Sequence, residues 1–174
     1  MSDQLRHAIF LFIEKLIRWS IHPKFRAKLL TLFGAKIGFN VRIYEVQFIN
    51  LSNGFKNLNI ADHVHIGAGC IIDLQGSVYI GERSTISPRV VVLSHQNPGE
   101  TQKNKLANLY RPKIGTTVIG KDCWIGANSV IVSGITIQDF VAIGAGSVVN
   151  KNIEKSHLAA GNPVKIIKKL YPAP

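Results

Sequence analysis

A six-residue period in the second half of the chain limits what this protein can fold into more than any other feature. From Ile119 onward an aliphatic residue returns at every sixth position, often with a glycine directly after it. A small or β-branched residue stands two places before each later step. Neither the 3.6-residue turn of an α-helix nor the two-residue alternation of a strand produces this period. The aliphatic steps are Ile119, Ile125, Ile131, Ile137, Ile143 and Val149.

The same pattern occurs earlier in the chain, so the repeat extends over most of it. Repeats of this kind bury their apolar faces only against their neighbours, and several must stack to be stable. The period therefore predicts a solenoid of short parallel strands, with the aliphatic residues inside and the strands stacked at roughly 4.8 Å. The earlier series are Ile60, Ile66 and Ile72, then Ile80, Ile86 and Val92, with a weaker first series of Ile37, Ile43 and Ile49.

Two interruptions break the repeat. The step from Ile72 to Ile80 has eight residues, which predicts a small bulge at 75–77. Between Val92 and Ile119 the register is lost, and we expect residues 97–113 to form an excursion from a corner of the solenoid. Long loops on rigid scaffolds often carry function.

Both ends of the chain differ from the repeats. A helix is predicted over residues 4–20, and a second from Pro23 that ends at Gly34. Another short helix is predicted over 163–170. We therefore divide the chain into a helical cap (1–34), a repeat domain (35–162) and a C-terminal helix with its tail (163–174). Residues 1–33 either cover the open end of the solenoid or also contact an anionic membrane surface, and both alternatives stay open.

The positive charge of the chain gathers at its ends. Of a net charge of +11, residues 1–36 hold seven Lys or Arg against two acidic residues, and residues 151–170 hold five Lys against one Glu. Such ends suit a phosphate-bearing ligand, a membrane surface or nucleic acid. We do not expect nucleic acid, because no nucleic-acid motif is present.

The sequence suggests a cytoplasmic protein. Two cysteines are too few for a disulfide framework. We find no small-residue cleavage site of a signal peptide near the N-terminus. The apolar run Ala8–Ile13 ends at a Glu-Lys pair, far short of the length of a membrane span.

Two segments carry a family resemblance. Residues 118–149 read VIGKDCWIGANSVIVSGITIQDFVAIGAGSVV, and residues 159–169 read AAGNPVKIIKK. They resemble the maltose/galactoside branch of the hexapeptide-repeat acyltransferases, and the N-terminal helices are similar to those of polysaccharide-associated members. The resemblance implies a mainly β fold, a left-handed parallel β-helix of about five coils. It also implies acetyl-CoA as co-substrate, a sugar or glycan acceptor, and a homotrimer with its sites between neighbouring prisms.

His95 is the candidate general base. It stands in Leu-Ser-His-Gln-Asn-Pro just before the excursion, where the family has its base. A sugar hydroxyl is a poor nucleophile, and an imidazole titrating near pH 6.5 suits the removal of its proton. Asp73 is the candidate partner, since Ile72 and Val92 are third steps of successive coils and share one prism face. A turn-forming Asp73 without a catalytic role is the alternative.

The resemblance also implies a groove for coenzyme A. It places Trp124 beside the thioester arm, and small residues where pantetheine lies against the backbone. It also places lysines where they would bind the phosphates of coenzyme A. The groove residues are Trp124, Ala127, Gly144 and Ala145, and the cations are Lys151, Lys165 and Lys168.

The remaining candidates concern the acceptor and metals. His65 matches an acceptor-contacting position, and Tyr110 and Arg111 of the excursion are further acceptor candidates. His63 and His65, together with His95, could suggest zinc. A γ-carbonic anhydrase would show a further His-x₄-His pair, and the sequence contains none. We expect no metal. Cys70 and Cys123 occupy small inward positions and are expected to be inert core thiols.

The sequence thus predicts direct transfer of acetyl from acetyl-CoA to a sugar hydroxyl in a ternary complex. Two alternatives stay open. One is N-acetylation of an amino sugar or nucleotide amino sugar. The other is a non-catalytic β-helix scaffold that binds anionic partners through its basic ends.

Overall fold

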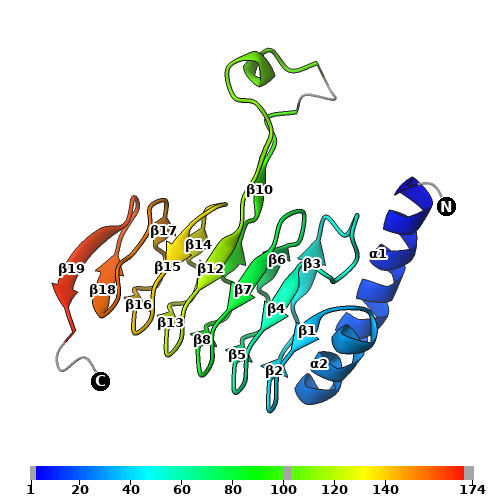
Figure 1. The fold of residues 1–174 in the computed structure, drawn as a ribbon, viewed down its shortest axis with the longest axis horizontal. Helices are drawn as coiled ribbons and strands as arrows, with labels where there is room; N and C mark the ends of the chain where they lie inside the picture. The colour runs from blue at the N-terminus through cyan, green and yellow to red at the C-terminus, as the bar shows by residue number, and fades with distance from the viewer. Residues whose placement is uncertain (1–2, 100–102, 171–174) are drawn as a thin grey trace.

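Three parallel β-sheets form the sides of a prism (Figure 1). A computed structural model describes residues 3–99 and 103–170. Sheet A contains β1 (Lys36–Ile37), β4 (Leu58–Ile60), β7 (Val78–Ile80), β12 (Thr117–Ile119) and β15 (Thr136–Ile137). Sheet B contains β2 (Arg42–Ile43), β5 (His65–Ile66), β8 (Thr85–Ile86), β13 (Trp124–Ile125), β16 (Ala142–Ile143), β18 (His157–Ala160) and β19 (Lys165–Lys169). Sheet C contains β3 (Gln47–Ile49), β6 (Ile71–Asp73), β9 (Val91–Val92), β14 (Val130–Ile131) and β17 (Val148–Val149).

The strands follow one another from sheet A to B to C, so each coil contributes one strand to each side. Five coils are complete, and a sixth begins where Ile153 bridges to Ile137 and continues into β18. The solenoid therefore has about six turns, slightly more than the five predicted.

The six-residue steps point into the prism, as predicted. Ile125 stacks between Ile86 and Ile143, and each of these side chains is at most 1% exposed. A buried Ile contributes roughly 1.5–3 kcal/mol to stability relative to an exposed one. The small inward positions fit beside these residues and satisfy their own polar atoms. Ser84 Oγ donates to the carbonyl of Gly120 at 2.7 Å.

The first coil departs from the predicted register by one residue. Phe48, and not Ile49, pairs with Ile72 and fills the core. The corner before it, at Tyr44 and Glu45, is one residue shorter than the equivalent corner of the next coil, Gly67 to Gly69. The weaker third step predicted at Ile49 was therefore wrong, because a shorter corner shifts every residue that follows it.

Two helices cover the open end of the first coil: α1 (Asp3–Trp19) and α2 (Pro23–Leu32) (Figure 1). Ile17 and Leu30 enter the hydrophobic core. Glu14 of α1 is buried, and its Oε1 accepts the N–H of Phe48 at 3.3 Å and lies 3.5 Å from Arg18 Nε. Burial raises the pKa of the Glu14 carboxyl, although Arg18 and the Phe48 N–H oppose the rise. The helices therefore cap the prism.

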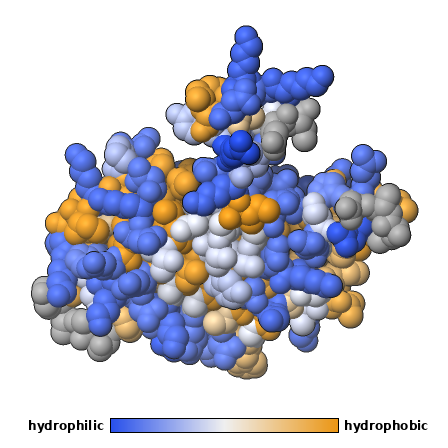
Figure 2. All heavy atoms as spheres, turned by 45° about the horizontal axis from the view of Figure 1, so that its top comes forward, coloured by the Kyte–Doolittle hydropathy of each residue, from blue (hydrophilic) through white to orange (hydrophobic). Residues whose placement is uncertain are grey.

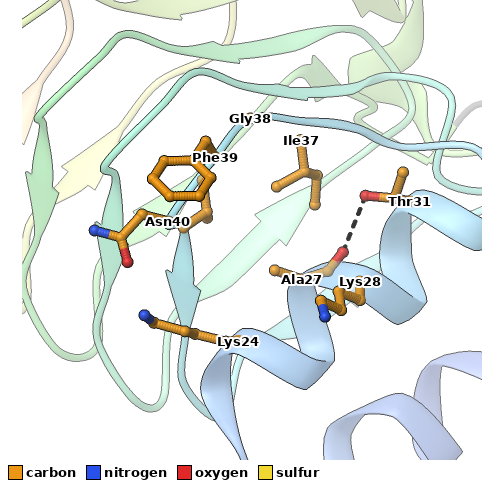
Figure 3. Close-up of a pocket in the computed structure, with 9 residues that line it drawn as sticks. Lys24, Ala27, Lys28, Thr31, Ile37, Gly38, Phe39 and Asn40 are labelled. Atoms are coloured by element: carbon orange, nitrogen blue, oxygen red, sulfur yellow. Dashed lines mark hydrogen bonds between the residues drawn. The ribbon is translucent and has the colours of Figure 1, made fainter.

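A pocket of about 370 Å³ separates α2 from the first corner (Figure 3). Lys24 and Lys28 line it from α2, opposite Phe39 and Asn40. None of the predicted site residues lines this pocket, so it belongs to the cap.

The predicted excursion stands away from the prism (Figure 1). Its stem is the antiparallel pair β10 (His95–Gln96) and β11 (Lys113–Ile114), and a 3₁₀ turn, η2 (Lys105–Asn108), lies near its tip. The excursion therefore begins at His95, two residues earlier than the predicted start at residue 97.

The predicted helix over residues 163–170 was wrong. This segment forms β19, which pairs antiparallel with β18. The free edge of β18 would otherwise expose unpaired N–H and C=O groups, and Val164, Ile166 and Ile167 favour a strand. The predicted tail from residue 171 lies outside the described residues.

Candidate functional site

Asp73 and His95 form a hydrogen-bonded pair at the corner between sheets C and A. Asp73 ends β6 and is fully buried, and its Oδ2 lies 2.6 Å from Nδ1 of His95. Ile72 of β6 pairs with Val92 of β9, so the predicted register, which places Asp73 close to His95, is confirmed. An ionised carboxylate only accepts hydrogen bonds, so Nδ1 of His95 carries the proton. In the neutral ring, Nε2 is then left as a free base.

The Asp73 carboxylate is held by four further contacts. Oδ2 accepts the backbone N–H groups of Ser94 and His95, each at 2.9 Å. Oδ1 accepts from Asn50 Nδ2 at 2.9 Å and from the Gln75 N–H at 3.1 Å. Burial acts to raise the pKa of Asp73, but hydrogen bonds from His95, Asn50, Ser94 and Gln75 outweigh it, and the pKa lies below its ordinary value. Asp73 is therefore ionised at neutral pH.

The sequence prediction missed two residues that support this pair. Asn50 lies at the same corner one coil earlier and fixes the far oxygen of Asp73. Ser94 Oγ donates to the Asp73 carbonyl and accepts the Gly76 N–H, both at 2.8 Å. The recurrence of a polar residue at this corner in successive coils was the signal that could have identified Asn50.

Trp124 lies at another corner of the prism. It begins β13 in sheet B, its side chain is 58% exposed, and its Nε1 donates to Ser87 Oγ at 3.0 Å. Ser87 belongs to the preceding coil and was also not predicted. This hydrogen bond lays the indole along the outside of the prism.

The small residues predicted for the groove stack beside Trp124, at the corner between sheets B and C. The N–H of Gly146 donates to the Ala127 carbonyl at 2.8 Å, which links two successive corners. A Cβ added at Gly144 would lie 2.7 Å from the Cβ of Ala160. Ala145 is exposed on the same corner. Gly144 thus allows the close approach of Ala160 from the next coil, and Ala127, Gly144 and Ala145 present only small side chains at this corner.

The three predicted lysines do not meet at one place. Lys165 and Lys168 are exposed on β19, where they pair with Ala160 and Leu158 at the end of sheet B. Lys151 follows β17 and so lies at the corner between sheets C and A, the corner of His95. Only Lys165 and Lys168 extend the side of the prism that carries Trp124.

Of the three acceptor candidates, His65 lies on another sheet than His95, whereas Tyr110 and Arg111 lie on the excursion whose stem contains His95. His65 lies on β5 of sheet B, with its ring centroid 5.1 Å from that of Tyr44. Burial, and then the charge of Arg42, lower the pKa of His65. Tyr110 and Arg111 are exposed on the excursion. A single chain therefore presents two partial sites, one at each edge of sheet C.

The described residues contain no exposed cysteine and no group of side chains that could hold a metal ion. Cys70 and Cys123 are buried, and burial raises the pKa of Cys123 to about 11. Within residues 3–99 and 103–170, no three His, Cys, Asp or Glu side chains gather in a way that could hold a metal ion. No helix in the same residues is long and apolar enough to cross a bilayer.

Comparisons with known proteins agree with the repeat and the fold. The family model of the bacterial transferase hexapeptide (six repeats) matches residues 116–151. WcaF of Escherichia coli, assigned to colanic acid biosynthesis as an acetyltransferase, is 30% identical over 155 residues, 89% of this chain and 77% of WcaF. A dTDP-4-amino-4,6-dideoxy-D-glucose acyltransferase of Escherichia coli is 33% identical over 135 residues, 75% of this chain and 69% of that protein.

A solved structure extends the comparison over nearly the whole chain. Galactoside acetyltransferase in complex with coenzyme A superposes with a TM-score of 0.82 at 26% identity, over 97% of this chain and 82% of that one. Such neighbours are left-handed β-helices. The repeat, the three-sided prism and these relatives together place the chain in the hexapeptide-repeat acyltransferase family, as an enzyme with a left-handed β-helix.

Proposed function

We propose that this protein transfers acetyl from acetyl-CoA to a hydroxyl group of a sugar or surface-glycan precursor. The observation that carries the proposal is the Asp73–His95 pair. Its 2.6 Å contact fixes the proton on Nδ1 and leaves Nε2 as a base at the rim of the corner. The side chain of His95 is 26% exposed, so a substrate can reach it.

The reaction is direct transfer in a ternary complex. Nε2 of His95 takes the proton as the acceptor oxygen attacks the thioester carbonyl carbon. The carbon–sulfur bond then breaks, and the thiolate of coenzyme A receives the proton from His95. Ionised Asp73 stabilises the imidazolium that forms between these steps. An acyl-enzyme on cysteine is disfavoured, because Cys70 and Cys123 are buried.

The corner beside Trp124 is the proposed groove for acetyl-CoA. Trp124 flanks the thioester arm, and the small side chains of Ala127, Gly144 and Ala145 let pantetheine lie against the backbone. Lys165 and Lys168 of the same chain bind the phosphates, and Lys151, at the corner of His95, reaches them from the neighbouring chain. The family resemblance supports this placement, and the coenzyme A complex of galactoside acetyltransferase supports coenzyme A as the ligand.

A complete site needs two chains. His95 lies at one edge of sheet C and Trp124 lies on sheet B beyond the other edge, so the base and the thioester arm come together only if neighbouring prisms pack side by side. A homotrimer does this three times by symmetry. The outer face of sheet C supports association, since Ile71, Val91, Val130 and Val148 form one half-buried apolar column. The neighbouring chain then also supplies His65, Tyr110 or Arg111 to the acceptor.

Release of free thiol from acetyl-CoA, measured with a panel of sugars and amino sugars, tests the proposal. We expect hydroxyl-dependent release that falls about 100-fold or more in His95→Ala. His22→Ala is the matched control, because His22 is exposed and its side chain makes no capping bond. Equal rates in wild type and His95→Ala would refute His95 as the base.

N-acetylation of an amino sugar is the second candidate, favoured by the similarity to the dTDP-4-amino-4,6-dideoxy-D-glucose acyltransferase. An amine in its free-base form is a better nucleophile than a hydroxyl and needs a base less. Turnover with amino sugars alone, surviving His95→Ala, would therefore favour this candidate over O-acetylation.

A further inference from the structure

Helix α1 carries a second apolar face that the prism does not cover. Its members recur at intervals of four and three residues, which places them in one stripe along the helix. Their exposed fractions lie between 40% and 78%. We call them the α1 stripe; they are Leu5, Ile9, Phe12, Leu16 and Trp19.

Capping does not explain the α1 stripe. The capping contacts of α1 come from Phe10, Ile13 and Ile17, which pack on or within the core, and from buried Glu14. The apolar exposure continues beyond α1, because Ile21 in the turn is 94% exposed. Two residues of α2, Phe25 and Leu32, are exposed as well. In Figure 2, apolar atoms at this end of the molecule are interspersed with hydrophilic ones.

The N-terminal segment that carries the α1 stripe is mainly positive in charge. Residues 1–36 contain seven Lys or Arg and two acidic residues, a net charge of +5. Lys15 is exposed and neighbours the stripe by helical spacing, Lys24 and Lys28 are exposed on α2, and the acidic Glu14 is buried beside Arg18. An exposed apolar helix face on a basic segment matches the chemistry of an anionic lipid surface, where apolar side chains enter the acyl boundary and cationic groups bind phosphates.

We propose that the α1 stripe docks on an anionic membrane surface and that the acceptor is a membrane-anchored glycan. The second part rests on the proposed acetyl transfer. The cap and the base lie close together along the prism. Helix α1 packs on β3, and His95 follows β9, two rungs or about 10 Å further along the same side. His95 therefore lies near the capped end of the prism, so a cap docked on a membrane would hold this end of the prism close to the membrane surface.

A second copy of the chain is the competing occupant of the α1 stripe. Subunit association along the prism uses the outer face of sheet C, whereas the stripe lies on the end cap. Parallel prisms related by a threefold axis would carry all three caps at the same end, so three stripes would face one surface. Such multivalent contact strengthens a weak individual attachment.

Vesicle sedimentation of the full-length protein tests the docking. We expect binding to vesicles of equal parts phosphatidylcholine and phosphatidylglycerol, weaker binding at high salt, and little binding to phosphatidylcholine alone. The double variant Phe12→Asp/Leu16→Asp should reduce the bound fraction at least tenfold. Leu109→Asp is the matched control, since Leu109 is 76% exposed on the excursion and should leave binding unchanged.

Trp19 reports the contact directly. In a Trp124→Phe background Trp19 is the remaining tryptophan, and its emission should shift to shorter wavelength with the anionic vesicles. Absence of vesicle binding, or equal binding by the double variant and wild type, would overturn the docking. A change of oligomeric state in the double variant without loss of vesicle binding would also overturn it and assign the stripe to a subunit contact.

Transfer assays separate this inference from the proposed function. The double variant should keep its rate with a soluble sugar and lose at least tenfold with the same sugar on a lipid anchor in anionic vesicles. Equal losses with both acceptors would overturn the membrane-anchored acceptor. Vesicle binding by a wild type that transfers no acetyl to either acceptor would leave the docking standing and refute the proposed function.

Discussion

At the scale of single residues, the chemistry of this protein depends on how Asp73 is kept charged inside the fold. A buried carboxylate without partners would become neutral. Here one oxygen accepts two backbone N–H groups and the His95 ring, and the other accepts Asn50 and the Gln75 N–H. The same bonds that lower the pKa of Asp73 also fix the tautomer of His95, so stability and proposed catalysis share one set of contacts.

Replacing Asp73 with Asn should therefore lower both the stability of the protein and its proposed catalytic activity. The amide nitrogen of Asn cannot accept the N–H groups of Ser94 and His95, and each donor left unpaired costs about 1–3 kcal/mol. We expect a lower Tm at neutral pH and a fall in kcat of at least tenfold. Circular dichroism melting and the thiol-release assay measure the two effects. An unchanged Tm with unchanged kcat would contradict the role given to this carboxylate.

The effect of Asp73→Asn should also depend on pH. The folded pKa of Asp73 lies below the value of about 3.9 in an unfolded chain. The stabilisation from the ionised carboxylate is thus fully present above about pH 4 and is lost as the pH falls through the folded pKa. The Tm difference between wild type and variant should be constant from neutral pH to about pH 5 and shrink below about pH 4. A difference that widens in acid would reverse this sign.

At the scale of elements, each coil is stable only through the coils beside it. Ile125 has no exposed surface and stacks on Ile86 and Ile143 of the adjacent coils. The last described segment shows that the edge of the stack also determines the secondary structure of the residues that follow it. The final segment became β19, because an open sheet edge offered it backbone partners that a short helix would have left unpaired.

Truncating one inward step should therefore destabilise the solenoid. We expect Ile125→Ala to lower the free energy of unfolding by about 2–5 kcal/mol, since it leaves a cavity between two coils. Ile167→Ala on β19, where the side chain is 58% exposed, should change it by less than about 0.5 kcal/mol. Chemical denaturation followed by circular dichroism measures both. Similar losses for the two variants would show that coil stacking does not dominate stability.

At the scale of the whole molecule, the proposed active site is divided between two corners of the prism. His95 lies at the edge of sheet C that leads to sheet A, and Trp124 lies beyond the other edge. The straight prism holds these corners apart because every coil keeps the same three-sided cross-section. In the proposed trimer, a neighbouring chain brings the two corners together.

Mixed trimers should reveal this division. His95→Ala and Trp124→Ala are each expected to be nearly inactive. When the two variants are co-expressed, each mixed trimer contains one interface with both wild-type residues. Random assembly from equal amounts then gives roughly a quarter of the intact sites of wild type. Restored thiol release at about that level supports the shared site, and co-expressed variants that form mixed trimers but stay inactive would contradict it.

The sequence by itself determined the repeat, the inward residues and the pairing of Asp73 with His95. A period of six in a solenoid fixes which residues stack, so neighbours in space follow from counting along the chain. Only the tertiary structure decided the features that do not follow from the six-residue period. The shortened corner at Tyr44 shifted the first coil, the edge of β18 turned a predicted helix into a strand, and Asn50 joined Asp73 across a coil. These outcomes depend on corner length, open edges and side-chain reach, which are set by the packed coils and not by the local sequence.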